Sequence, residues 1–115
     1  MTPFKLDLTV TKGITFGPIL FTFKDSNGDP FDLTGWQPHA HARSSPGAKS
    51  KIDLAPAITD AAAGEAEIPV KTDEVTLSYL AGELSWDLIL ESPGGVRIGP
   101  LFKGDFLVKE IITHG

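Results

Sequence analysis

Apolar and polar side chains alternate along most of this chain of 115 residues. Residues 4–10 show the pattern well, because every second position carries an apolar side chain. Successive side chains of a strand point to opposite faces, so this period predicts a strand with one buried face. Similar runs predict strands at residues 14–23, 36–43, 51–59 (as one or two short pieces), 65–70, 83–91, 96–102 and 105–113.

Residues that favour turns separate these runs. Residues 25–30, Asp-Ser-Asn-Gly-Asp-Pro, contain an Asn-Gly pair that takes positive φ at little cost. Gly17-Pro18 is expected to mark a bulge, a bend or an edge position in the second strand. Further turns or loops are expected at residues 44–50, 60–64, 92–95 and 103–104.

One segment, residues 72–80, predicts a short helix. Thr72 or Asp73 can cap its N-terminus, and Gly82 can end it. A helix of about two turns is too short to be stable alone, so it must pack on a sheet. We therefore expect one domain over residues 1–115: an all-β, antiparallel β-sandwich or flattened barrel of about seven or eight strands, with one short helix near residues 72–80.

Composition agrees with a folded domain and excludes several classes of protein. Hydrophobic residues make up 41% of the chain and charged residues 22%, which argues against disorder. The chain has no cysteine, so disulfides and thiolate metal sites are excluded. No signal peptide or membrane-spanning run is visible, so we expect synthesis in the cytoplasm and no membrane contact.

The formal net charge of −5 carries limited information about partners. The whole excess of acidic residues lies in residues 61–115, and no basic cluster occurs. Nucleic acid is therefore not an expected partner. An acidic surface suits solubility and can steer a basic partner.

The spacing of Asp25, Asn27 and Asp29 is that of the start of a calcium-binding loop. The sixth position of such a loop needs glycine and is Pro30, and the twelfth needs glutamate and is Trp36. A hairpin turn held by hydrogen bonds to Asp and Asn side chains is the better interpretation.

His39 and His41 lie on one side of a predicted strand and could contribute to a metal site. A closed site needs a third or fourth ligand, so exposed or partner-facing histidines are favoured. No metal, cofactor or catalytic residue is expected. Pairs such as Glu65 and Glu67 are typical of an acidic outer strand face, and no Gly-x-Ser-x-Gly motif occurs.

The two tryptophans allow a second hypothesis. Trp86 alternates with Leu84 and Leu88, which favours core packing. Trp36 follows a turn and could instead stack on a ligand, as in carbohydrate-binding modules. Trp36, His39 and His41 are therefore the candidate contacts for a partner or ligand.

Four strings carry a family resemblance: residues 28–35 (GDPFDLTG), 82–88 (GELSWDL), 93–96 (PGGV) and 103–108 (KGDFLV). Together with a basic residue at a strand end, Arg43, they resemble small phage-type virion proteins of tail, baseplate and head–tail accessory regions. The resemblance covers the chain from about residue 16 to residue 113. It departs at Glu83-Leu84, where an aromatic residue often precedes the Ser-Trp-Asp string.

The resemblance implies roles for several of these residues. Gly28 and Pro30 would shape a turn, Leu33 and Trp86 would pack in the core, and Gly104 would permit the last hairpin. It also implies a non-enzymatic structural or assembly protein of a phage or prophage particle. Such a protein would contact other virion or tail proteins, would form a homo-oligomer, and would be found in the virion.

Overall fold

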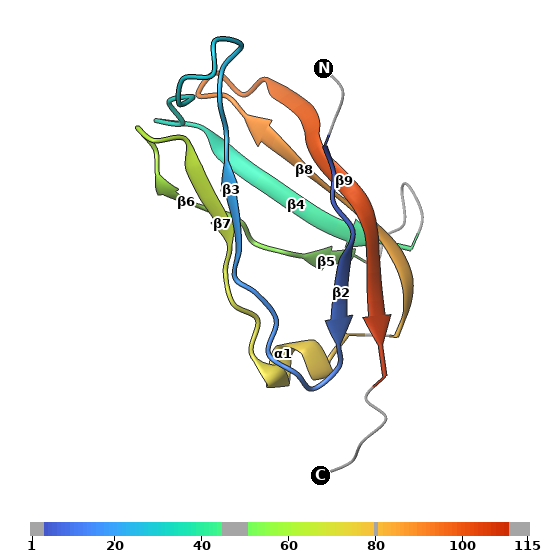
Figure 1. Ribbon diagram of the computed structural model, residues 1–115. Coiled ribbons are helices and arrows are strands. Elements are labelled where there is room, and N and C mark those ends of the chain that lie inside the picture. Colours follow the sequence, from blue (N-terminus) through green and yellow to red (C-terminus); the bar gives the residue numbers. More distant parts are fainter. Residues whose placement is uncertain (1–3, 45–50, 80, 111–115) are drawn as a thin grey trace.

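The computed structural model describes residues 4–44, 51–79 and 81–110 (Figure 1). These residues form nine strands and one helix. The elements are β1 (Phe4–Lys5), β2 (Leu8–Thr11), β3 (Ile19–Thr22), β4 (Gln37–Arg43), β5 (Lys51–Asp53), β6 (Ala57–Asp60), β7 (Glu65–Ile68), α1 (Asp73–Leu77), β8 (Gly82–Glu91) and β9 (Arg97–Lys109). In this part of the chain no helix is long and apolar enough to span a membrane.

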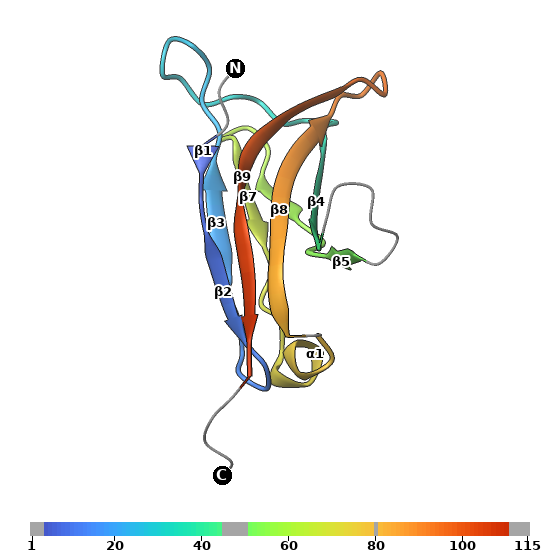
Figure 2. The same cartoon turned by 90° about the vertical axis from the view of Figure 1, so that its right-hand side faces the viewer.

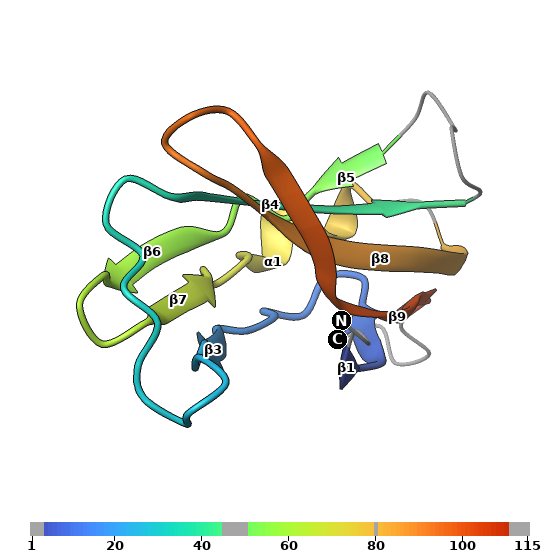
Figure 3. The ribbon, with the colours of Figure 1, turned by 90° about the horizontal axis from the view of Figure 1, so that it is seen from above.

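The strands form two sheets that pack face to face. The larger sheet has the order β1-β9-β8-β4-β5, with β2 following β1 along the same edge of β9. The smaller sheet has the order β3-β7-β6. Viewed from above, β4, β5 and β8 belong to one layer and β3, β6 and β7 to the other (Figure 3). The predicted all-β sandwich with one short helix is confirmed.

The first two strands pair with the last one in an unexpected direction. Both β1 and β2 run parallel to β9, whereas the other strand pairs of the described residues are antiparallel. Figure 2 shows β1 and β2 lying along β9 at the edge of the larger sheet. The strand order is that of an immunoglobulin-type sandwich whose first strand lies beside the last one.

The core lies between the sheets, where alternate residues meet. Trp86, Leu88 and Leu90 of β8 are buried, as are Ala40 and Ala42 of the neighbouring β4. The predicted inward face of both strands is therefore confirmed, and so is the predicted core position of Trp86. The core residues that are at most 2% exposed include Val10, Leu33, Leu54, Ala66, Ile68, Phe106 and Val108.

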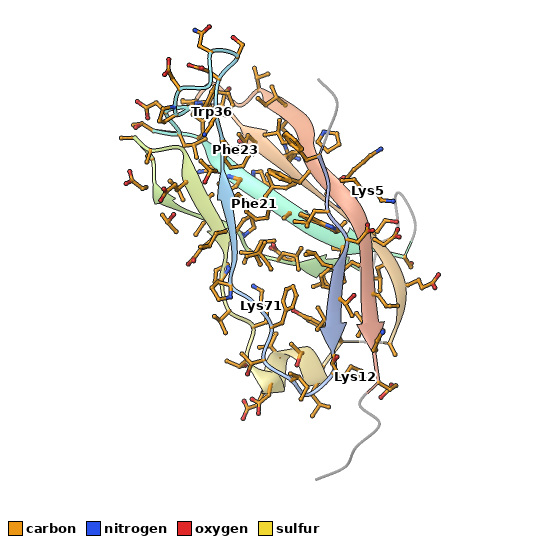
Figure 4. All side chains as sticks on the ribbon, in the orientation of Figure 1. Lys5, Lys12, Phe21, Phe23, Trp36 and Lys71 are labelled. Carbon is orange, nitrogen blue, oxygen red and sulfur yellow. The ribbon has the colours of Figure 1, made fainter. Side chains whose placement is uncertain are left out.

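The aromatic centre of the core joins the two layers. Phe21 lies in β3 of the smaller sheet, and Phe23 follows directly after that strand (Figure 4). The Phe21 ring lies 4.8 Å from that of Phe102 and 6.3 Å from that of Trp86, measured between centroids. Both partners belong to the larger sheet, so these contacts fix the two sheets against each other.

The turn at residues 25–30 forms as predicted. The Asp25 carboxylate accepts hydrogen bonds from the backbone N–H groups of Asn27 (2.9 Å) and Asp29 (3.0 Å). Gly28 has a φ of 84°, which an L-residue adopts at a cost. Of the three side chains that resemble the start of a calcium loop, Asp25 thus holds the turn through its carboxylate.

The predicted turn at Lys103-Gly104 is wrong, and so is a last hairpin at Gly104. β9 runs without a break from Arg97 to Lys109, so the two predicted strands 96–102 and 105–113 are one strand. The glycine is needed for a different reason. A Cβ atom on Gly104 would clash with the carbonyl oxygen of Leu6, because the segment between β1 and β2 lies directly against β9 there. Residues 111–113 lie outside the described residues.

Other boundaries differ from the predictions by a few residues. The second strand covers only Ile19–Thr22, after a cis peptide bond between Gly17 and Pro18. The helix begins after Thr72, whose hydroxyl accepts from Val75 N, and ends at Leu77. Gly82 does not end the helix but begins β8. Leu80 and most of the predicted loop 44–50 lie outside the described residues.

Candidate functional site

Trp36 lies just before β4 and is partly buried against the core. Its ring packs edge-on against Phe31, with 5.4 Å between the ring centroids. Its backbone N–H donates to Leu33 O at 2.9 Å. Figure 4 shows Trp36 at the end of the sandwich away from α1. The Trp36 ring is therefore used, at least in part, for packing against Phe31 and the core.

His39 and His41 lie on the outer face of β4, opposite the buried Ala40 and Ala42. This placement agrees with the predicted face. Because Trp36 packs with the core and the two histidines point outward, the structure does not gather the three candidate residues into one site.

Each histidine has a carboxylate nearby. His39 Nε2 lies 3.3 Å from Glu91 Oε1, but it is not aligned for a hydrogen bond. That oxygen accepts a hydrogen bond from Arg97 Nε at 3.2 Å. His41 Nε2 lies 3.9 Å from Asp53 Oδ1. Among the described residues, no three His, Cys, Asp or Glu side chains are grouped so that they could hold a metal ion.

The environment of His41 disfavours its charged form. Burial lowers the pKa of His41, and the neighbouring positive charge of Lys51 lowers it further. Asp53 acts in the opposite direction but does not reverse the shift. The outer face of β4 therefore holds His41 as a neutral imidazole down to a lower pH than usual.

A concavity of the described surface lies elsewhere, beside α1. A pocket of about 710 Å³ opens between β5, the start of β8 and the segment that leads from β7 into α1. Its wall is formed by Ser44, Lys51, Ile52, Asp53, Lys71, Val75, Ser78, Tyr79, Ala81, Gly82, Glu83 and Leu84. Only four of these, Ile52, Lys71, Tyr79 and Leu84, are buried or half-buried, and the others form an exposed rim.

The inner wall is held in place by the fold. Ile52 and Leu84 lie on the inward faces of β5 and β8. The backbone of Lys71 exchanges two hydrogen bonds with Phe16, at 2.7 and 2.9 Å. Tyr79 N donates to Thr76 O at 3.1 Å, directly after α1. Figure 4 shows Lys71 near α1, at the lower end of the sandwich.

The two polar groups of the inner wall lack partners. The Tyr79 hydroxyl is buried and makes no hydrogen bond within the described structure. No salt bridge to Lys71 occurs among the described residues. Burial raises the pKa of Tyr79 and lowers the pKa of Lys71. Asp53 opposes the shift of Lys71 through its charge.

The sequence did not point to Lys71 and Tyr79 as a pair. Tyr79 lies near the end of the predicted helix, and Lys71 precedes the predicted helix cap. Lys71 is held by its backbone bonds to Phe16, which is distant in the sequence, so no local pattern marks the pair. The pairing with β5 and β8, which completes the pocket, depends on long-range strand order.

Exposed apolar side chains gather at the same end of the molecule. Ile14, Val70, Val75 and Leu77 are all more than 40% exposed. Thr76 Oγ1 accepts from Gly13 N at 3.1 Å and donates to Ile14 O at 2.9 Å, which fixes the β2–β3 loop against α1. Val75 also belongs to the wall of the pocket. We call these four side chains, which lie on α1 or on the segments next to it, the α1-end patch.

Comparisons with known proteins give little further information. The chain matches no protein-family model and no curated protein. A solved structure from Bacteroides vulgatus, of a protein proposed to be a glycoside hydrolase, is similar to 90% of this chain at 16% identity and a TM-score of 0.48. This chain spans 16% of that protein's length. A likeness this distant leaves the function open.

Proposed function

We propose that this chain is a non-enzymatic structural or assembly component of a phage or prophage particle, from its tail, baseplate or head–tail region. It would act through protein–protein contacts. The resemblance of residues 28–35, 82–88, 93–96 and 103–108 to small virion proteins supports the class of particle. These strings consist of turn and core residues, so they support the fold of such a module. They do not indicate which surface binds a partner.

The observation that carries the proposal is the α1-end patch. Exposed apolar side chains that are grouped together and bordered by polar residues are typical of interaction surfaces. Asp73 and Glu74 of the first helical turn border the patch with negative charge. Contacts of this kind combine an apolar centre with a charged rim that sets orientation.

The partner would be a neighbouring virion protein, either a second copy of this chain or another tail protein. The molecule is about 48 Å long, and Val96 lies in the turn at the opposite end from α1 (Figure 1). Val96 is also apolar and 62% exposed, so it provides a matched control for the patch.

The test is assembly measured by light scattering after size-exclusion chromatography, with cross-linking and particle fractions as independent readouts. We expect Leu77→Lys to abolish assembly and Val96→Lys to leave it unchanged. Lysine at the last helical position is compatible with the helix dipole, so the helix should survive. The proposal would be abandoned if the wild type were monomeric at every concentration and absent from purified particles.

The alternative function is a carbohydrate- or ligand-binding sandwich. Trp36 supports it weakly, because its ring packs against Phe31. The pocket beside α1 is a second place where a ligand could bind, since Ile52 and Leu84 give it an apolar wall. Tryptophan fluorescence with a glycan array distinguishes the two sites. A binding signal that is lost in Trp36→Ala, with the fold intact, would support ligand binding at Trp36.

A further inference from the structure

We propose that the free edge of β3 binds one extended segment of a partner protein, in which apolar side chains alternate with basic ones. The segment would add a fourth strand to the smaller sheet, a mode of recognition in which main-chain hydrogen bonds supply affinity. The inference goes beyond the assembly role proposed above, because it concerns a different surface and a defined kind of contact.

The backbone of β3 has unpaired groups on one side. Phe23 N donates to Gly64 O at 2.8 Å, directly beyond the paired part of the strand. In an antiparallel pair, successive residues alternate between bonding to the partner strand and pointing away from it. The N–H and C=O groups of Phe21 therefore face β7, whereas those of Leu20 and Thr22 face the free edge. Among the described residues, β3 pairs with β7 alone.

The edge of β3 also lacks the features that usually protect an exposed strand. Such edges are commonly short, charged, bulged or covered. Of the other described sheet edges, β5 has three residues, two of them charged, and β6 has an irregular register between Ile58 and Asp60. The edge formed by β1 and β2 is interrupted between these two short strands. β3 has a regular register and the uncharged sequence Ile-Leu-Phe-Thr, so it is the edge best suited to accept a strand.

Phe4 of β1 gives a second, independent reason. Phe4 and Phe102 are Cα partners, and their rings stack with 5.8 Å between the centroids. Since the Phe102 ring lies 4.8 Å from that of Phe21, the Phe4 side chain also points toward the layer of the smaller sheet. Phe4 is nevertheless 72% exposed. The smaller sheet ends at β3 on this side, so a strand added there would lie opposite β1 and cover Phe4 (Figure 2).

The space beside β3 is the width of one strand. The contact of Phe21 with Phe102 places β3 opposite β9, and the larger sheet continues beyond β9 by β1 alone at this level. Neighbouring strands lie about 4.8 Å apart. If a second copy paired its own β3 here, its β9 would have to occupy the place of β1. A single extended segment fits, whereas the sheet edge of a second copy does not.

The charge beside this edge favours basic side chains on the added segment. Glu65 and Glu67 lie on the outer face of β7, in register with Thr22 and Leu20. Outward side chains of an added strand would be two strand spacings away, roughly 10 Å, which is close to the Debye length at physiological salt. Lys24, two residues beyond β3, offsets part of the negative charge. The preference for basic side chains should therefore be modest and should be seen best at low salt.

The test uses the peptide acetyl-Thr-Val-Lys-Val-Lys-Val-Thr-amide and the same peptide with glutamate in place of both lysines. We expect the lysine peptide to slow the hydrogen exchange of the Leu20 and Thr22 amides, measured by NMR. The glutamate peptide should bind at least about threefold more weakly at low salt. Two further lysine peptides carry N-methyl groups on the two lysine amides or on two valine amides. Because successive N–H groups of a strand point to opposite edges, only one of these two should lose binding, by about tenfold or more.

Variants of the chain locate the binding. Thr22→Pro replaces a free N–H without removing a bond to β7, which edge strands tolerate, and it should abolish peptide binding. Thr22→Val keeps the N–H and the branched side chain, so it should retain binding. Phe4→Ala should weaken binding about tenfold, because the added strand would no longer cover an aromatic ring. Leu77→Lys, in the α1-end patch, should leave peptide binding unchanged, so this proposal and the assembly proposal can fail separately.

Four outcomes would overturn the proposal. No protection of the two amides at millimolar peptide would reject the edge as a binding site. Equal affinities of the two N-methylated peptides would show that binding does not use strand pairing. A glutamate peptide that bound as tightly as the lysine peptide would reject the basic partner. A wild-type dimer that Thr22→Pro converted to monomer would make a second copy the occupant. If Thr22→Pro did not fold, Phe4→Ala and the N-methylated peptides would still decide the question.

Discussion

Replacing Gly104 with alanine would test how the first strands are held against the last one. Gly104 lies within β9, directly opposite Trp86 of β8. A Cβ atom there would clash with Leu6 O, and it would lie 2.6 Å from the Leu6 carbonyl carbon and 2.8 Å from Asp7 Oδ1. Because the first two are backbone atoms, no side-chain rotation relieves the clash. The segment that contains Leu6 and Asp7 must move.

Three hydrogen bonds depend on that segment. Leu6 N donates to Lys103 O at 2.8 Å, and Trp86 Nε1 donates to Leu6 O at 2.6 Å. The third is from Asp105 N to Asp7 Oδ1 at 2.9 Å. Each contributes about 0.5–1.5 kcal/mol, and an unpaired buried indole N–H costs about 1–3 kcal/mol. Alanine returns about 0.4–1 kcal/mol by restricting the unfolded chain.

We therefore expect Gly104→Ala to lower the free energy of unfolding by about 2–4 kcal/mol and Tm by roughly 10 °C. Urea unfolding followed by tryptophan fluorescence measures the first quantity directly. Gly94→Ala is the matched control, since the nearest atom to its Cβ would be Ser92 Oγ at 3.8 Å. The control should change the free energy by less than about 0.5 kcal/mol. If Gly104→Ala lowered the free energy of unfolding by less than about 1 kcal/mol, the reasoning would be refuted, because the segment that contains Leu6 and Asp7 would then be held only loosely.

Three further predictions concern stability and pH. Trp86→Phe should lower the free energy of unfolding by about 2–4 kcal/mol in urea, since it removes the bond to Leu6 O and leaves a gap in the core; a neutral result would contradict the assigned bond. Thr76→Val should cost about 2–3 kcal/mol in thermal unfolding, because it leaves Gly13 N and a loop carbonyl without their partner, whereas Thr76→Ser should retain most of the stability. The pKa of His41 lies below its usual 6.5, so the unfolded chain binds more protons, and stability should fall as pH drops through 6.5 toward the lower, folded-state pKa. His41→Asn should flatten that dependence, and an NMR titration of His41 with a pKa above 6.5 would contradict the sign.

The parts of the fold that the sequence predicted are those set by neighbouring residues. A period of two fixed the buried faces of β4 and β8, where Ala40 and Trp86 point inward as expected. The Asx turn at Asp25 and the cap at Thr72 are likewise local devices, and both were predicted from residue type alone.

The errors arose where a distant segment decides the structure. Lys103-Gly104 has the composition of a turn, yet Gly104 lies within a strand. Its lack of a side chain makes room for the backbone of Leu6, almost 100 residues earlier in the chain. The parallel pairing of β1 and β2 with β9 also could not be predicted from neighbouring residues. The alternation of apolar and polar side chains does not show in which direction a strand runs relative to its partner. The same limit applies to the pocket, since Lys71 and Tyr79 become neighbours of Ile52 only when β5 is placed beside β4.

The helix inserted between β7 and β8 separates the pocket from the exposed Leu77 at this end of the molecule. The chain from residue 69 to residue 81 leaves the smaller sheet, forms α1 and enters the larger sheet, so it closes the sandwich at this end (Figure 1). Its inner side forms the pocket wall with Tyr79, whereas its outer side exposes Leu77. Because the two side chains serve different faces, Tyr79→Phe should leave assembly unchanged, whereas Leu77→Lys should abolish it. If Tyr79→Phe also abolished assembly in the same light-scattering measurement, the pocket side of α1 would belong to the docking surface.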